Sequence, residues 1–397
     1  MSKATFLALV ARIARVPIWT LLRLVPTQRH AVVHGWPDGE ANAVEVVRAL
    51  ARRYPRPTYW LLDDPSYAGP TFAAAELWSE RVVRLQKGSL RALRMSLSAE
   101  LTLFTHGLYT AVRQPADRLV VNLWHGDGPK ATSDTQLVRS SVVVAQTRLW
   151  GEYKAKVFSL PPESLALVGN PRVDQFDEDL PEEAAARLGL LPGRRRVLWL
   201  PTYRQARGPR ARSMDDGDNL TDSADVRDLV TALAETAKRL SLDLVVKPHP
   251  LDVDDYTGMA IRVLRNEHLD AAGVSLYQLL GHCDALISDV SSVWVDYLVL
   301  DRPIAFYLPD LADLERRRGL NVPDFAALAP GPQVKTADDG RLFLEQVAAG
   351  TAARPSEHPR HAEFGLVSGT GAADRLLDWL DVHRRTHGAQ SLFTADD

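Results

Sequence analysis

The sequence predicts an α/β protein built from two Rossmann-like domains that face each other across a cleft. Three observations favour this architecture. Short apolar runs that suit buried strands alternate with helical segments, a pattern typical of parallel sheets with both faces covered. The alternation stops at Leu191-Pro192-Gly193-Arg194 and then begins again. A chain of 397 residues also exceeds the size of one typical domain.

The first half contains seven predicted strands, each a short apolar run that ends at polar residues, glycine or proline. They lie at residues 30–33, 58–62, 81–85, 101–104, 119–123, 140–145 and 165–168. Helices are predicted at residues 41–53, 151–158 and 180–188, where apolar residues recur at helical spacing.

The second half repeats the pattern with strands at 197–200, 242–246, 285–287 and 304–308 and helices at 226–240, 276–280 and 293–300. Residues 205–225 are predicted to form a long mobile loop, and loops of that length are often lids or binding loops. We therefore expect an N-terminal domain over residues 29–190, a C-terminal domain over 191–385 and a flexible tail over 386–397.

The composition describes an ordinary globular protein, with 46% hydrophobic and 24% charged residues. The net charge of −3 does not indicate a nucleic-acid partner. The single cysteine, Cys283, excludes an intramolecular disulfide and a cysteine-based zinc site. We find no constellation of metal ligands in the sequence, and we predict neither a metal nor a cofactor.

Residues 1–28 differ from the rest of the chain. No acidic residue appears before Asp38, and basic residues alternate with apolar ones; the basic positions are Lys3, Arg12, Arg15, Arg23 and, just beyond, Arg29. No uncharged run approaches the ~20 residues of a spanning helix. The pattern predicts an amphipathic helix that lies on an anionic membrane surface, kinked at Pro17. The alternative is a helix packed on the core of the protein itself.

Polar groups follow the predicted strands at their carboxyl ends, where open α/β sheets bind ligands. Four strands end in basic or imidazole side chains, in the segments His125-Gly126-Asp127-Gly128-Pro129-Lys130, Gly169-Asn170-Pro171-Arg172-Val173-Asp174, Pro201-Thr202-Tyr203-Arg204 and Lys247-Pro248-His249-Pro250. Any one of these segments is weak support, because a single histidine at a strand end is usually structural. Together they supply cations and titratable groups that suit a diphosphate.

A fifth strand ends in the turn Asp289-Val290-Ser291-Ser292, directly before a helix. Free backbone N–H groups and two hydroxyls at such a turn suit an anionic group such as phosphate. The alternative is that Ser291 only caps the helix. From this turn alone the two interpretations are equally supported.

These segments, in this order, resemble those of the CDP-glycerol glycerophosphotransferases, which prime and polymerise teichoic acids. The family signatures correspond to Trp124–Lys130, Gly169–Asp174, Pro201–Arg204, Lys247–Pro250 and Asp289–Tyr307. The resemblance covers about residues 100–312 and implies the GT-B fold. One departure is His-Gly-Asp-Gly-Pro-Lys, where the family more often has His-Gly-Thr-Pro-Leu-Lys.

The resemblance also implies roles for individual residues. His125 and His249 are the expected catalytic residues, with His125 as general base on the acceptor hydroxyl. The expected donor and phosphate ligands are Arg204, Lys247, Ser291, Ser292 and Asp296, and the expected acceptor-side ligands are Lys130 and Arg172. For Asp296, binding of a ribose hydroxyl and a structural capping role stay open.

The implied reaction is transfer of a polyol phosphate, most simply glycerol phosphate, from a CDP-activated donor to a hydroxyl of a lipid-linked or polymeric acceptor, with release of CMP. The partners would be the CDP-polyol, that acceptor and an anionic membrane surface on the cytoplasmic side. A nucleotide-sugar glycosyltransferase or epimerase of the same fold is the second interpretation. A non-catalytic binding protein docked to the membrane is the third.

Overall fold

A computed structural model describes residues 24–67, 69, 75–107, 114–115, 117–131, 139–201, 223–248, 261–309 and 311–394. The chain divides into two compact units. Unit 1 comprises Met1–His125, Ser133–Asp174 and Gly371–Asp397, and unit 2 comprises Gly126–Thr132 and Gln175–Thr370.

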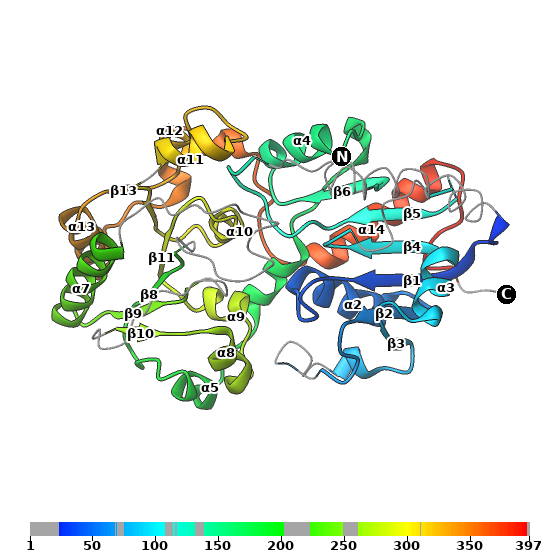
Figure 1. The fold of residues 1–397 in the computed structure, drawn as a ribbon, viewed down its shortest axis with the longest axis horizontal. Coiled ribbons are helices and arrows are strands. Elements are labelled where there is room, and N and C mark those ends of the chain that lie inside the picture. The colour runs from blue at the N-terminus through cyan, green and yellow to red at the C-terminus, as the bar shows by residue number, and fades with distance from the viewer. Residues whose placement is uncertain are drawn as a thin grey trace, which may run out of the picture. The chain divides into compact units, whose positions relative to one another are not determined.

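Unit 1 is built on a seven-stranded parallel sheet in the order β3-β2-β1-β4-β5-β6-β7 (Figure 1). The strands are β1 (Gln28–His34), β2 (Thr58–Leu62), β3 (Val82–Gln86), β4 (Ala99–Phe104), β5 (Leu119–Asn122), β6 (Val142–Ala145) and β7 (Leu165–Leu167). Its main helices are α2 (Ala41–Arg53), α3 (Leu90–Ser98), α4 (Arg148–Val157) and α14 (Ala372–Thr386).

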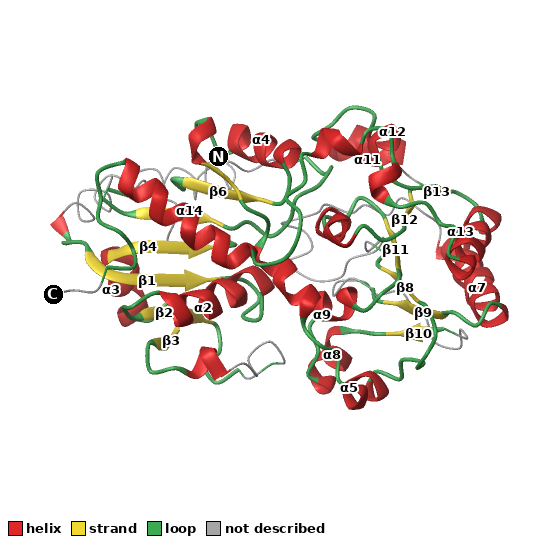
Figure 2. Cartoon of the chain, turned by 180° about the vertical axis from the view of Figure 1, so that it is seen from behind, coloured by secondary structure: helices red, strands yellow, loops and turns green. Residues whose placement is uncertain are grey.

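Both faces of this sheet are buried, as the continuous apolar runs predict. Successive side chains of a strand point to opposite faces, so Ala31 and Val33 pack in the core cluster of α2 and α14, while Val32 packs with Ala92 and Met95 of α3. Figure 2 shows α2 and α14 on one face of the sheet. The face covered by α2 and α14 holds most of the buried apolar side chains of unit 1.

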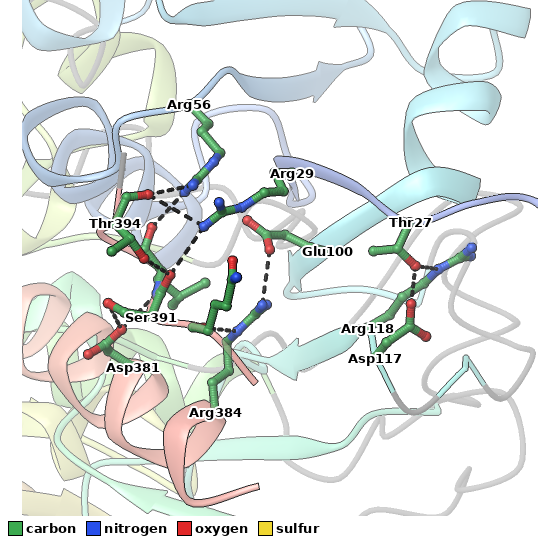
Figure 3. A network of polar contacts seen from close by, with 12 residues as sticks. Thr27, Arg29, Arg56, Glu100, Asp117, Arg118, Asp381, Arg384, Ser391 and Thr394 are labelled. Carbon is green, nitrogen blue, oxygen red and sulfur yellow. Dashed lines mark hydrogen bonds and ion pairs between the residues drawn. The ribbon is translucent and has the colours of Figure 1, made fainter. Parts of the chain in front are cut away.

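A network of polar contacts holds the C-terminal segment to unit 1 (Figure 3). The Arg56 guanidinium donates to the carbonyl oxygens of Leu392, at 3.0 Å, and Thr394. The Asp381 carboxylate accepts from the Leu392 N–H at 2.7 Å and from the Ser391 hydroxyl at 2.6 Å. The Leu392 side chain is buried in the core. Residues 391–394, which we expected to belong to a flexible tail over residues 386–397, thus make contacts with Arg56, far away in the sequence, and with Asp381 in α14.

Unit 2 is built on a six-stranded parallel sheet in the order β10-β9-β8-β11-β12-β13. The strands are β8 (Arg196–Trp199), β9 (Asp243–Val246), β10 (Arg262–Val263), β11 (Ala285–Ser288), β12 (Ile304–Tyr307) and β13 (Gln333–Val334). The helices are α5 (Glu182–Arg187), α7 (Ser223–Arg239), α8 (Asn266–Ala272), α9 (Leu276–Gly281), α10 (Val293–Tyr297), α11 (Leu311–Arg318), α12 (Phe325–Leu328) and α13 (Ala337–Ala349).

The boundaries of the units differ from those we expected. Unit 1 ends at Asp174 rather than near residue 190, it regains the chain at Gly371, and residues 126–132 belong to unit 2. The Asp174 carboxylate accepts hydrogen bonds from the first backbone N–H groups of α14, at 2.6 and 2.9 Å. Helix α14 then buries Leu376, Leu377 and Leu380 in the core of unit 1. Such long-range contacts cannot be predicted from the order of strands and helices in the sequence.

Two predicted segments lie outside the described residues. They are residues 1–23 of the expected membrane-surface helix and residues 205–222 of the expected loop. The last residue of the expected helix, Gln28, begins β1, and Arg118 donates to the carbonyl of Val25 just before it (Figure 3 labels Arg118 beside Thr27). Among the described residues, no helix has the length and apolar character needed to cross a membrane.

Candidate active site

The turn after β11 carries two hydroxyl side chains, and a hydrogen bond within the turn holds its backbone. The Asp289 carboxylate accepts the Ser291 N–H at 2.8 Å, which closes the turn. The Ser291 hydroxyl lies 3.5 Å from the Val293 N–H, the outer limit of a hydrogen bond. Ser292 occupies the N-cap of α10, yet its side chain makes no capping hydrogen bond. The capping alternative concerned Ser291, and the long Val293 contact is its only counterpart here. The Ser292 hydroxyl lies at the carboxyl end of β11.

The short helix behind this turn is anchored by an aromatic cluster. Trp294 is fully buried and lies within 6 Å of the ring centres of three phenylalanines, Phe306, Phe325 and Phe364. Burying one large apolar side chain contributes about 1.5–3 kcal/mol, and favourable aromatic pairs add about 0.5–1.5 kcal/mol each. This packing fixes the position of the residues that precede it, including Ser292.

Asp296 lies one helical turn beyond Ser292 but does not share its surface. Its side chain is completely buried, and its carboxylate accepts the Tyr277 hydroxyl at 2.7 Å. The Tyr277 contact is a structural one, and binding of a ribose hydroxyl by Asp296 stays a prediction.

Lys247 follows β9 and is nearly buried. Its backbone N–H donates to the Trp199 carbonyl at 2.9 Å, so the residue continues the register of the sheet. Burial lowers the pKa of the Lys247 ammonium to about 8, and the nearby Glu267 and Asp270 of α8 partly offset this effect. A cation that titrates near neutral pH therefore stands at the same edge of the sheet as the serine turn.

Residues 126–131 pack against the serine turn. A Cβ added at Gly126 would lie 2.7 Å from the Ser292 Cβ, and one added at Gly128 would lie 3.4 Å from the Ser292 Cα. Lys130 follows and pairs with Leu320 in an isolated antiparallel bridge. Lys130, which we expected among the acceptor-side ligands, is thus part of unit 2 together with Ser291 and Ser292.

His125 follows β5 in unit 1, and its ring lies among other aromatic rings. Its imidazole stacks on His106 with 4.4 Å between ring centroids and lies 4.3 Å from the Trp124 ring. The Trp36 ring lies 5.6 Å from His106 in an edge arrangement, and Trp36 is 42% exposed. Burial lowers the pKa of His125 to about 4, although its contact with the Thr105 carbonyl opposes the shift. The imidazole is therefore neutral at pH 7 and able to accept a proton.

Arg172 fixes the backbone of His125. Its guanidinium donates to the His125 carbonyl oxygen at 2.7 Å, and its own backbone N–H donates to the Asn42 side-chain oxygen at 3.0 Å. The turn that carries Arg172 begins at Gly169, whose φ of +91° is a conformation that glycine adopts readily. Arg172 therefore positions the candidate base, in addition to placing a cation beside it.

Asn42 and Glu40 are site residues that the sequence did not reveal. The Asn42 amide donates to the Trp124 carbonyl at 3.3 Å and to the Glu40 carboxylate at 3.1 Å. Glu40 also accepts the Ala43 N–H at the start of α2. Burial raises the pKa of Glu40 to about 7, while Arg172 acts in the opposite direction. The only sequence signal was an acidic and an amide residue at the start of a predicted helix, which usually means a cap.

The expected site residues thus divide between the units. His125 and Arg172 are brought together in unit 1, whereas Lys130, Lys247, Ser291, Ser292 and Asp296 belong to unit 2. Arg204 and His249 lie outside the described residues. In the ranges that the structure describes, no three His, Cys, Asp or Glu side chains are grouped as a metal site would need.

Comparison with known proteins identifies the family. Residues 33–364 match the family described as CDP-Glycerol:Poly(glycerophosphate) glycerophosphotransferase. The chain belongs to this family. The match covers both units and every expected site residue, and so extends beyond the segments that first suggested it.

Several curated relatives act on teichoic acids according to their names. The chain is 29% identical over 187 residues to the teichoic acid ribitol-phosphate primase of Bacillus spizizenii, covering 45% of this chain and 43% of the relative. It is 24% identical over 258 residues to the teichoic acid ribitol-phosphate polymerase TarK of Staphylococcus aureus, covering 59% and 47%. The chain spans less than half the length of these relatives.

The fold is similar to that of the wall teichoic acid polymerase TagF. The two structures superpose with a TM-score of 0.64 over 98% of this chain and 99% of the other, at 14% sequence identity. A UDP-GlcNAc 2-epimerase from Neisseria meningitidis is also similar, with a TM-score of 0.53 over 88% of this chain and 99% of the epimerase, at 11% identity. These likenesses establish the α/β architecture of parallel sheets that the sequence predicts.

Proposed function

We propose that the protein transfers a polyol phosphate from a CDP-polyol to a hydroxyl of a teichoic-acid-like acceptor and releases CMP. The observation that carries the proposal is that this chain, a member of the family, has two features together. One is a neutral imidazole, His125, held in position after β5, and the other is a Ser-Ser turn after β11. The names of the relatives support a polyol phosphate substrate, and a TagF variant was soaked with CDPG. Glycerol phosphate is the simplest form of the proposal, and ribitol phosphate is equally compatible with these names.

The proposed chemistry requires positioning and neutralisation of charge more than covalent catalysis. The acceptor hydroxyl attacks the β-phosphorus, a new P–O bond forms, and the bond between this phosphorus and the bridging oxygen breaks. His125 takes the proton of the attacking hydroxyl, and the CMP phosphate leaves with the bridging oxygen. Hydroxyls of Ser291 and Ser292, with the Lys247 ammonium, would hold the diphosphate.

A nucleotide-sugar enzyme is the second candidate, because the epimerase shares the fold. The family match and the Ser-Ser turn favour the CDP-polyol, since they concern this chain itself rather than its architecture. The third candidate, a binding protein without activity, is less well supported because it predicts loss of at least one motif histidine, and both His125 and His249 are present in the sequence.

The test is incubation of the purified full-length protein with CDP-glycerol, CDP-ribitol and UDP-GlcNAc, each with a glycan-lipid acceptor, followed by detection of CMP or UDP. We expect CMP from a CDP-polyol and a loss of about 10²–10⁴-fold in rate for His125→Ala, the usual effect of removing a positioned base. Turnover of UDP-GlcNAc alone, or equal rates for wild type and the variant, contradicts the proposal.

We also propose that residues 1–28 bind the cytoplasmic face of the cell membrane, where a lipid-linked acceptor is accessible. The support is the charge pattern, with basic residues and no acid among apolar side chains. Each basic residue near anionic lipid contributes about 1 kcal/mol, so binding should be reversible and sensitive to salt. Co-sedimentation of full-length and truncated protein with anionic vesicles tests this; equal pelleting of both forms would refute it.

A further inference from the structure

Residues 126–131 belong to unit 2, and Asn321 makes three of the hydrogen bonds that hold them there. The Asn321 amide nitrogen donates to the Gly128 carbonyl at 3.0 Å and to the Lys130 carbonyl at 2.8 Å. The Asn321 backbone N–H donates to the Pro129 carbonyl between them, at 2.7 Å. Three consecutive carbonyl groups are thus bonded to a single residue.

The chain around Asn321 is itself fixed. Gly319 ends α11, with its N–H bonded to the Glu315 carbonyl at 3.0 Å and a φ of +80°, and its carbonyl accepts the Ala131 N–H at 3.2 Å. Val322 and Phe325, which follow, are buried. Asn321 therefore connects residues 128–130 to a part of unit 2 that is anchored on both sides.

The segment held in this way covers the serine turn. Gly126 and Gly128 both approach Ser292 so closely that a Cβ at the first position would overlap it. Lys130 lies two residues beyond Gly128, on the same bonded stretch. The segment was expected to serve the acceptor, but it lies against Ser292, a residue expected to hold the donor diphosphate.

We propose that Asn321 is a positioning residue of the donor site: it holds residues 126–131 against Ser292 and so places Lys130 on the donor phosphates. The proposal rests on the proposed function and deepens it, because it assigns Lys130 to the CDP-polyol instead of the acceptor. Asn321 acts through the segment and does not itself touch the substrate.

The test compares Asn321→Ala with Gln333→Ala. Gln333 is a matched control, because its side-chain amide also donates to a backbone carbonyl of unit 2, that of Ala326 at 3.1 Å, but is bonded outside the segment. Loss of two ordinary hydrogen bonds corresponds to a factor of about 5–150. We expect Asn321→Ala to raise the KM for CDP-glycerol or CDP-ribitol within that range while the acceptor KM stays unchanged, and to speed amide hydrogen exchange in residues 126–131. Gln333→Ala should change neither quantity.

A second variant keeps the inference falsifiable if Asn321→Ala does not fold. Lys130→Met leaves in place the three hydrogen bonds that Asn321 donates to the carbonyls of residues 128–130, and it should raise the donor KM alone. An unchanged donor KM in a folded Asn321→Ala, or a rise of the acceptor KM instead in Lys130→Met, overturns the inference. A wild-type protein that releases CMP from no CDP-polyol overturns the proposed function itself, which distinguishes the two failures.

Discussion

Replacing Gly126 by alanine adds a single methyl group directly against Ser292. The new Cβ would lie 2.7 Å from the Ser292 Cβ, closer than two carbon atoms approach without a bond. The backbone of Gly126 is not among those with positive φ, so alanine is compatible with its conformation. The contact with Ser292 is therefore the source of the expected effect.

The magnitude follows from this overlap. Forcing an extra methyl group into a packed position typically costs about 1–3 kcal/mol. Trp294 prevents the serine turn from retreating as a whole, because it is fully buried among other aromatic rings. If the strain is relieved by displacing Ser292 from the donor phosphates, kcat/KM should fall by about 5–150-fold, at 1.36 kcal/mol for each factor of ten.

Gly128→Ala provides the matched control in the same segment. Its added Cβ would lie 3.4 Å from the Ser292 Cα and 3.6 Å from the Ser292 Cβ, which is ordinary van der Waals distance. CMP release with a CDP-polyol should fall for Gly126→Ala and stay within about threefold of wild type for Gly128→Ala, the latter figure corresponding to less than 1 kcal/mol. Thermal unfolding of both variants checks that the fold survives. Equal activity of the two variants would refute the reasoning.

Three further predictions concern protonation. Since the pKa of His125 is lowered to about 4, the acid limb of the kcat/KM profile should lie below pH 5, and a limb near pH 6.5 would contradict the assigned base. Since the pKa of Lys247 is about 8, affinity for CDP-glycerol in calorimetry should weaken as pH rises through 8, and Lys247→Arg should remove this dependence. The raised pKa of Glu40 means that its protonated form stabilises the fold below pH 4.5 and that this stabilisation is lost as pH rises through 7; denaturant titrations of wild type and Glu40→Gln should diverge by about 1 kcal/mol per pH unit in this interval.

The sequence predicted the central strands and helices well where burial is continuous. Helix Ala41–Arg53 and strand Thr58–Leu62 occupy the expected residues, because apolar side chains recur along the helix and fill most of the strand. Helix Leu90–Ser98 was missed, since its outer face exposes Leu90 and Leu93 and so blurs the helical period. Residues beyond 308 were left without assignment, although most of them form helices and one short strand.

The strand ends were predicted as the location of the site, but the residues that organise it were not. The order of strands and helices places His125 and Ser292 at carboxyl ends without any knowledge of distant contacts. Asn42 and Asn321, in contrast, act through hydrogen bonds to carbonyl groups 82 and 191 or more residues away in the chain. The residues next to an asparagine in the sequence do not indicate a hydrogen-bond partner so far away, so only the structure reveals these two contacts.

The unit boundary between His125 and Gly126 gives the two asparagines different roles. Asn42 bonds the Trp124 carbonyl and the Arg172 N–H, and through them it fixes the peptide of His125. Asn321 fixes the residues that follow. Because the base acts in the chemical step, loss of the first asparagine should lower kcat, whereas loss of the second should raise the donor KM. One contiguous block of sequence is therefore expected to carry two separable kinetic functions, divided at a single peptide bond.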